Sequence, residues 1–91
     1  MNTALIDASI DGDYIKAKSL IEDGIDLNLM DEYGCTALTN AAYLGSNKIV
    51  KLLVKNGANI GMRGYEGKTA MELAVEYENV KVIETLEEIS V

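Results

Sequence analysis

The chain has 91 residues and a formal net charge of −7, with 48% apolar and 25% charged side chains. This composition is typical of a globular protein, and the length suits one small domain. The acidic excess argues against nucleic acid as a ligand, since phosphate binding needs clustered lysine and arginine. No apolar run approaches the roughly 18 residues that cross a bilayer, so we expect no membrane partner. We also expect no export signal, because the first ten residues lack a basic start and a long apolar stretch.

The sequence has no histidine and a single cysteine, Cys35. Without histidine, the commonest general base and the commonest neutral metal ligand are missing. One thiol cannot form an intrachain disulfide or a multi-thiolate zinc site. We therefore expect no enzymatic activity, no cofactor and no metal. This cysteine usage suits a reducing compartment, and we expect a cytoplasmic protein.

A period of 33 residues runs through the whole chain. Thr3, Thr36 and Thr69 are separated by this interval, and an alanine follows each of them. Other small and apolar residues recur at the same interval, namely Ala8, Ala41 and Ala74, and Leu20, Leu53 and Leu86. Small, apolar and turn-forming residues are those that stacked structural units require, so the period indicates a repeat protein.

Each unit is predicted, in chain order, to contain a helix, a short turn, a second helix and a loop with glycine. In the central unit Thr36 is a good N-cap, and Gly45 is expected to end the first helix. An apolar stripe at i, i+3, i+4 spacing then predicts a second helix that ends before Gly57. In the third unit Thr69 and Glu72 have the spacing of a capping box. No unit alone hides its apolar side, so neighbouring units must stack.

The central unit resembles the ankyrin repeat. Its segment DEYGCTALTNAAYLG, residues 31–45, and the later Val50, Leu52, Leu53, Gly57 and Ala58 match the pattern of that family. The resemblance covers the whole chain as a single ankyrin repeat domain with repeats at 1–30, 31–63 and 64–91. It implies an all-α repeat solenoid, in which helix-turn-helix units with β-hairpin-like loops form a slightly curved, L-shaped stack.

Several positions depart from the family pattern. Ala37 and Ala70 stand where the family has proline, and Thr39 and Glu72 replace its usual histidine. Gly61 and Gly64 replace an expected Asn and Asp, so we expect the second hairpin loop to be looser than the first. Glu78 replaces the glycine of the earlier units, which suits a terminal unit.

The family implies binding of a partner protein through the loop tips and first helices, without catalysis. The corresponding positions in this chain are Ile10, Asp11, Glu32, Tyr33, Cys35, Tyr43, Leu44, Tyr65, Glu66, Lys68, Glu76 and Tyr77. Four of the five tyrosines lie on this one predicted face, and tyrosine is over-used in interfaces. Alternatively, tyrosine serves there as the only aromatic filler of a chain without Phe or Trp. We treat Cys35 as a small, exposed residue at a variable position.

Charge is unevenly distributed along the chain. Residues 33–65 carry four basic and no acidic side chains, whereas both flanking segments are acidic. Lys48, Lys51 and Lys55 lie on one face of the second central helix. Stacking would place Glu22 and Glu88 in register with Lys55, and Glu84 in register with Lys51. We therefore interpret the lysines as solvent-exposed residues that pair between units. A phosphate site is the alternative.

Two short motifs are better explained by structure than by ligand binding. Gly67-Lys68-Thr69 ends like a phosphate loop, but Met62 stands where that loop needs glycine. Asp11-Gly-Asp13 lacks the later ligands of a calcium loop, and we interpret it as an acidic turn between helices.

We therefore predict a monomeric, non-enzymatic protein–protein interaction module that docks a partner on its concave face of loops and first helices. The acidic residues on this face favour a partner with a basic surface. One alternative is an inhibitor or immunity-type protein that masks a basic target surface. Another is a structural fragment of a larger repeat assembly.

Overall fold

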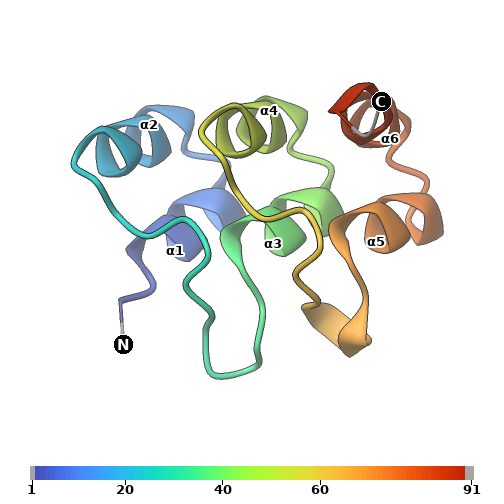
Figure 1. Cartoon of the computed structure of the whole chain (residues 1–91), viewed down its shortest axis with the longest axis horizontal. Helices are drawn as coiled ribbons and strands as arrows, with labels where there is room; N and C mark the ends of the chain where they lie inside the picture. The colour runs from blue at the N-terminus through green and yellow to red at the C-terminus, as the bar shows by residue number, and fades with distance from the viewer. Residues whose placement is uncertain (1, 90–91) are drawn as a thin grey trace.

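Paired helices make up most of the computed structural model, which describes residues 2–89. Within this range the α-helices are α1 (Ala4–Asp11), α2 (Tyr14–Glu22), α3 (Ala37–Leu44), α4 (Asn47–Lys55), α5 (Ala70–Glu76) and α6 (Val80–Ile89). A 3-10 turn, η1 (Tyr65–Gly67), lies in the second long loop. Figure 1 shows α1, α3 and α5 side by side in one layer and α2, α4 and α6 in a second layer. The two long loops project away from the layer of α2, α4 and α6, so the all-α repeat fold is confirmed.

Glycine and threonine set the helix ends, as the sequence predicts. Gly12 and Gly45 end α1 and α3 in the left-handed region, with φ of 70° and 76°. A side chain there would be strained, which explains why glycine recurs. Thr36 begins α3, and its hydroxyl accepts the backbone N–H of Thr39. The Thr39 hydroxyl in turn accepts the N–H of Thr36, so this N-terminus is closed by two threonines.

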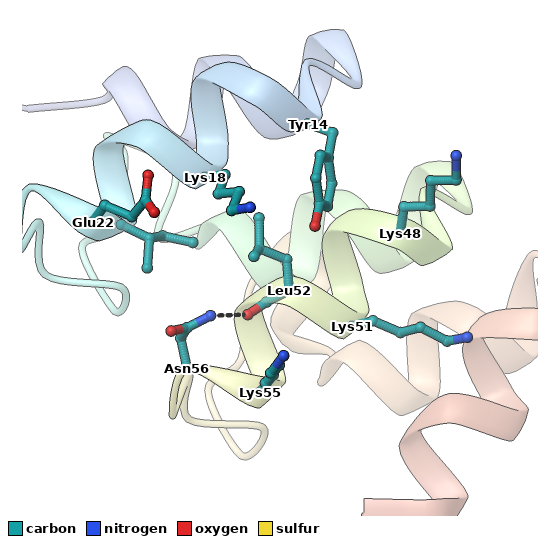
Figure 2. Close-up of a pocket in the computed structure, with 9 residues that line it drawn as sticks. Tyr14, Lys18, Glu22, Lys48, Lys51, Leu52, Lys55 and Asn56 are labelled. Carbon is teal, nitrogen blue, oxygen red and sulfur yellow. Dashed lines mark hydrogen bonds between the residues drawn. The ribbon is translucent and has the colours of Figure 1, made fainter.

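The core lies at the seams between neighbouring helix pairs. Ala8, Ala41 and Ala74, which share the 33-residue period, are at most 1% exposed and come from α1, α3 and α5. Each of these helices contacts the next, and small side chains let them approach closely. In the other layer Leu53 is fully buried, whereas its counterpart Leu20 on α2 is only partly buried. Between α2 and α4 a surface groove remains open (Figure 2).

Side-chain amides and hydroxyls fix the register between pairs. The Asn79 side-chain nitrogen donates to the carbonyl oxygens of Ala42 at 2.6 Å and Tyr43 at 3.1 Å. The Thr85 hydroxyl donates to the Asn47 side-chain oxygen at 2.8 Å. These bonds satisfy polar groups at the end of α3 and the start of α4, so they tie the last pair to the central pair.

The second long loop is not looser than the first, contrary to the sequence-based expectation. Its backbone forms an antiparallel bridge between Arg63 and Thr69, whereas the first loop has no such bridge among residues 2–89. Gly64 explains the difference. A Cβ atom on it would lie 2.4 Å from the Thr39 hydroxyl oxygen, so glycine lets this loop lie directly on α3. The Gly64 N–H then bonds to the Lys68 carbonyl at 2.9 Å.

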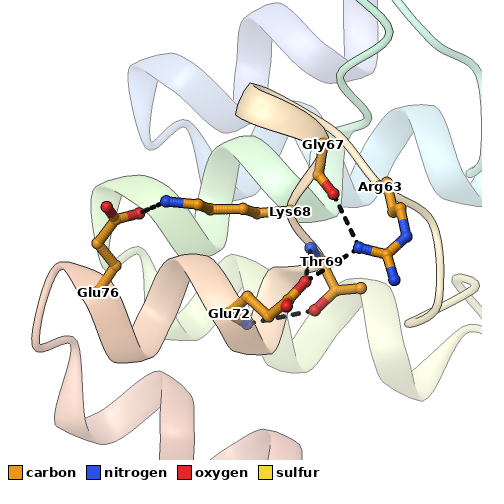
Figure 3. A network of polar contacts seen from close by, with 6 residues as sticks. All are labelled: Arg63, Gly67, Lys68, Thr69, Glu72 and Glu76. Atoms are coloured by element: carbon orange, nitrogen blue, oxygen red, sulfur yellow. Dashed lines mark hydrogen bonds and ion pairs between the residues drawn. The ribbon is translucent and has the colours of Figure 1, made fainter.

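A polar network joins this loop to the start of α5 (Figure 3). The Glu72 carboxylate accepts the backbone N–H of Thr69 at 3.0 Å, while the Thr69 hydroxyl accepts the N–H of Glu72, which is the predicted capping box. Arg63 donates to the same carboxylate at 3.3 Å and to the Gly67 carbonyl at 2.8 Å. The Thr69 backbone bond, then its hydroxyl and the Arg63 charge, lower the pKa of Glu72. Burial opposes this shift.

Glu78 supplies the first testable prediction. It has φ of +55° at the position where the earlier pairs have glycine. The left-handed region costs a side-chain-bearing residue about 1 kcal/mol or more. We expect Glu78→Gly to raise the free energy of unfolding by about 0.5–1 kcal/mol in urea denaturation. Glu84→Gly, the same exchange inside α6, should lower it by about 1 kcal/mol. A loss of stability in Glu78→Gly would contradict this account.

The capping box supplies the second prediction. A carboxyl whose pKa is lowered on folding stabilises the fold above its unfolded-state pKa, and this contribution is lost as the pH falls through the lowered value. In a carbon-detected NMR titration, Glu72 should therefore titrate below the usual value of about 4.3. Arg63→Gln should recover only part of the shift, because the Thr69 backbone N–H is the main cause. A midpoint at or above the usual value would rule out the carboxylate as the cap of α5.

Candidate functional site

Three tyrosines meet where α3, the second loop and α5 come together. The ring of Tyr43, near the end of α3, lies 5.3 Å from the ring of Tyr65 in η1, centroid to centroid. It lies 4.7 Å from the ring of Tyr77, which follows α5, with an interplanar angle of 85°. Edge-to-face and tilted contacts at these distances are favourable for aromatic rings. We call Tyr43, Tyr65 and Tyr77 the tyrosine cluster.

A groove of about 540 Å³ lies beside the tyrosine cluster and extends to the end of α1. Its residues come from α1, the first long loop, α3 and η1, so segments far apart in the sequence form it together. We call it the tyrosine groove; it is lined by Ile10, Asp31, Tyr33, Cys35, Thr39, Asn40, Tyr43, Tyr65 and Glu66. Six of these were predicted as site residues from the sequence.

The tip of the first long loop presents a tyrosine that is almost free of contacts. Tyr33 is 78% exposed, and its backbone N–H donates to the Asp31 carboxylate at 2.9 Å. The same carboxylate oxygen accepts the N–H of Cys35 at 3.0 Å, and the Asp31 N–H bonds to the Cys35 carbonyl. Asp31 thus closes the loop from inside. The ring of Tyr33 is exposed on a backbone that is held in place.

The exposed position predicted for Cys35 is wrong. Its side chain is 6% exposed, because two hydrogen bonds between its backbone and Asp31, together with the capped start of α3, hold it at the base of the loop. Burial, and then the Asp31 carboxylate, raise the pKa of the thiol. The thiol is therefore neutral at pH 7 and forms part of the groove floor.

Lys68 is partly neutralised by its neighbours. Its ammonium forms a short hydrogen bond with Glu76 and lies 3.6 Å from a Glu66 carboxylate oxygen. The bond with Glu76 is the main cause that raises the pKa of Lys68. Burial, followed by the Glu76 charge, raises the pKa of the Tyr77 hydroxyl, which therefore stays protonated at neutral pH.

Six predicted residues do not line the groove. Asp11 is exposed at the end of α1, directly after the groove residue Ile10. Leu44 is 47% exposed beside Tyr43 in the chain. The remaining predicted residues outside the groove lining are Glu32, Lys68, Glu76 and Tyr77.

Sequence reasoning missed Asp31, Thr39 and Asn40 as groove residues. Asn40 lies three residues before Tyr43 on α3, which places both on one helix face, so the spacing could have indicated it. Thr39 was identified only as a departure from the family pattern. Asp31 was identified only as part of the motif, and nothing in the sequence shows that its carboxylate faces the groove.

The arrangement presents phenols, carboxylates, an amide and apolar side chains from α1, α3 and the two long loops. Across residues 2–89 no group of three His, Cys, Asp or Glu side chains is placed to hold a metal ion. No helix in the same range is long and apolar enough to cross a membrane.

Comparisons with known proteins agree with this geometry. The family model for ankyrin repeats (three copies) matches residues 5–90. The E3 ubiquitin-protein ligase XBAT33 of Arabidopsis thaliana is 38% identical over 84 residues, which are 90% of this chain and 16% of the ligase. This chain thus spans less than a fifth of that relative.

Two solved structures share the fold. A chain in the complex of the predatory endopeptidase Bd0816 from Bdellovibrio bacteriovorus with immunity protein Bd3460 superposes with a TM-score of 0.87 and 39% identity. That match covers 96% of this chain and 46% of the other. The human ASB11 ankyrin repeat domain gives the same TM-score at 25% identity, covering 96% of this chain and 39% of the other. The repeat period, the stacked helix pairs and the match over residues 5–90 show that this chain belongs to the ankyrin repeat family.

Proposed function

We propose that this chain binds one partner protein on the tyrosine groove and the adjoining tyrosine cluster, and that it does so without catalysis. Ankyrin repeats are protein–protein interaction modules. The observation that carries the proposal is the gathering of Tyr33, Tyr43 and Tyr65 around one groove. Tyrosine offers a large contact area at low entropic cost, and its hydroxyl can still bond to a partner. We further propose that the chain acts as a monomer in the cytoplasm.

Charge around the groove favours a partner with a basic surface. Asp31 and Glu66 line the groove, and Glu32 lies beside Tyr33 at the loop tip. Lys68, in the second loop, is engaged by Glu66 and Glu76. The carboxylates of Asp31 and Glu32 form no ion pair within residues 2–89, although one Asp31 oxygen accepts two backbone N–H groups of its own loop. No cation among these residues compensates either charge, so both would attract lysine or arginine of a partner.

Hydrogen bonds that fix the conformation of both long loops support rigid docking of a partner. Asp31 closes the first loop, and Arg63 with Glu72 ties the second loop to α5. Little backbone freedom is then lost on association, which favours affinity. The partner surface would meet a preformed groove rather than order a flexible one.

The double variant Tyr33→Ala/Tyr65→Ala tests the proposal. Both rings are exposed by 47% or more, so their removal should leave helical circular dichroism unchanged. Loss of two central tyrosines typically weakens an interface by about 2 kcal/mol or more, or roughly thirtyfold in affinity. Immobilised wild-type protein should retain a native partner from the source cell extract that the double variant does not retain.

Ile15→Ala is the control, because Ile15 is an exposed side chain on α2 that lines neither the tyrosine groove nor the groove between α2 and α4. It should retain the same partner as the wild type. Recovery should also fall as salt is raised, since the proposed attraction is screened. Equal retention by all three proteins would exclude the tyrosine groove as the docking site.

A second candidate function is that of an inhibitor or immunity-type protein that masks its target. The 39% identity to a chain in an endopeptidase–immunity protein complex favours it, since that match covers 96% of this chain. If the captured partner is a hydrolase, wild-type protein should suppress its turnover at stoichiometric concentration, and Tyr33→Ala/Tyr65→Ala should not. Capture of the hydrolase without any change in its turnover would support an interaction module and exclude an inhibitor function.

A further inference from the structure

A second groove lies on the opposite layer of the molecule, between the outer helices α2 and α4. Its volume is about 730 Å³. We call it the lysine groove, and it is lined by Tyr14, Lys18, Ile21, Glu22, Lys48, Lys51, Leu52, Lys55 and Asn56. Four cations thus line a groove in a chain whose overall charge is −7.

The ion pairs expected for these lysines are not formed. Three glutamates, Glu22, Glu84 and Glu88, were expected to pair with lysines of α4. Within residues 2–89 neither Lys51 nor Lys55 lies within 4 Å of a carboxylate oxygen. Glu22 forms no ion pair within the same range. Figure 2 shows Lys51 extended away from α2. The interpretation of the stripe as ion pairs between repeats is therefore wrong for this structure.

The cations of α4 have no compensation on their own helix. Lys48, Lys51 and Lys55 follow one another at i+3 and i+4 spacing, and α4 has no acidic residue. Like charges at this spacing repel by a few tenths of a kcal/mol. A ligand with negative charge at matching intervals would relieve the repulsion. Across seven residues the stripe spans about 10.5 Å, or about two helical turns.

The floor of the groove is apolar, which adds a second requirement on the ligand. Leu52 lies between Lys18 and Lys55 in Figure 2, and Ile21 is only partly buried. The Tyr14 ring, 39% exposed, forms one end. A free anion would leave this apolar surface exposed to water, whereas a side chain such as leucine would cover it.

We propose that the lysine groove binds a short acidic amphipathic segment of a partner protein. A helix lying along α4 could place glutamates opposite the lysines and leucines on Ile21 and Leu52. This surface is distinct from the tyrosine groove in position and opposite to it in charge. The chain would then join a basic partner on one layer to an acidic partner on the other.

The distribution of charge disfavours an extended polyanion. The four lysines and one glutamate of the lysine groove sum to +3, which leaves −10 on the rest of the chain. A nucleic acid or an anionic membrane would extend beyond the groove and meet this acidic surface. A second copy of this chain offers glutamates on α6, but two chains of net charge −7 repel each other on approach.

The test measures binding of a fluorescently labelled synthetic helix that carries leucine on one face and glutamate on both flanks. Fluorescence anisotropy at low ionic strength should show binding that weakens as salt is added. The variant Lys48→Gln/Lys55→Gln should lower the affinity about tenfold or more, since each lysine contributes a charge-assisted contact. Lys16→Gln/Lys81→Gln removes the same charge outside the groove and should lower it far less.

Other outcomes would overturn the proposal. Equal binding of a peptide with glutamine in place of glutamate would show that charge does not determine binding. No binding of the glutamate peptide at low salt would show that the lysine groove is not a binding site for it. Tighter binding to phosphatidylserine vesicles or single-stranded DNA, lost in Lys48→Gln/Lys55→Gln, would assign the groove to a different ligand. Sedimentation showing a dimer that this variant abolishes would assign it to a second copy.

The two proposals can fail separately. Tyr33→Ala/Tyr65→Ala should leave binding of the acidic peptide unchanged, because neither residue lines the lysine groove. Loss of peptide binding in that variant, with circular dichroism intact, would contradict two independent surfaces.

Discussion

Burial of small side chains between neighbouring helix pairs is the interaction on which this structure depends. Ala8, Ala41 and Ala74 leave almost no exposed surface, and the helices that carry them contact one another in sequence. No pair covers its own apolar side, so each pair depends on its neighbour for stability. The consequence for function is geometric. Close, regular stacking places the long loops at fixed intervals, and residues from distant parts of the chain can then share one groove.

Much of the fold could be predicted from the sequence, because the repeat encodes local and global structure in the same residues. Local hydrogen bonding and backbone conformation set the helix termini, and the spacing of residues alone reveals them. Examples are the start of α3 at Thr36, its end at Gly45, and the start of α5 at the Thr69–Glu72 pair. The site was predicted less completely. The face of loops and first helices was identified from the sequence. The burial of Cys35 was not, because it follows from a hydrogen bond that Asp31 accepts across its loop, and residue spacing does not show such bonds.

Two other differences between the sequence-based expectations and the structure also arise from side chains whose contacts the sequence does not show. The second loop was expected to be loose because of its glycines, yet Gly64 allows a close approach to Thr39 that tightens it. The lysines of α4 were expected to pair because register places acids nearby. Register fixes where a backbone lies but not which way a long side chain points, and Lys51 extends away from α2. Sequence spacing therefore located the charged stripe and could not assign its partner.

Asn79 has a consequence that reaches beyond its own hydrogen bonds. Its side chain bonds to the last carbonyls of α3, and a Cβ atom at Gly45 would lie 2.9 Å from its oxygen. The Asn79 amide thus occupies the space that a side chain at position 45 would need. Because its partners are main-chain carbonyls, the bond does not depend on which side chains Ala42 and Tyr43 carry. It does depend on glycine at position 45, since a side chain there would collide with the amide. The backbone at the end of α3 therefore sets where the last helix pair sits on the central one.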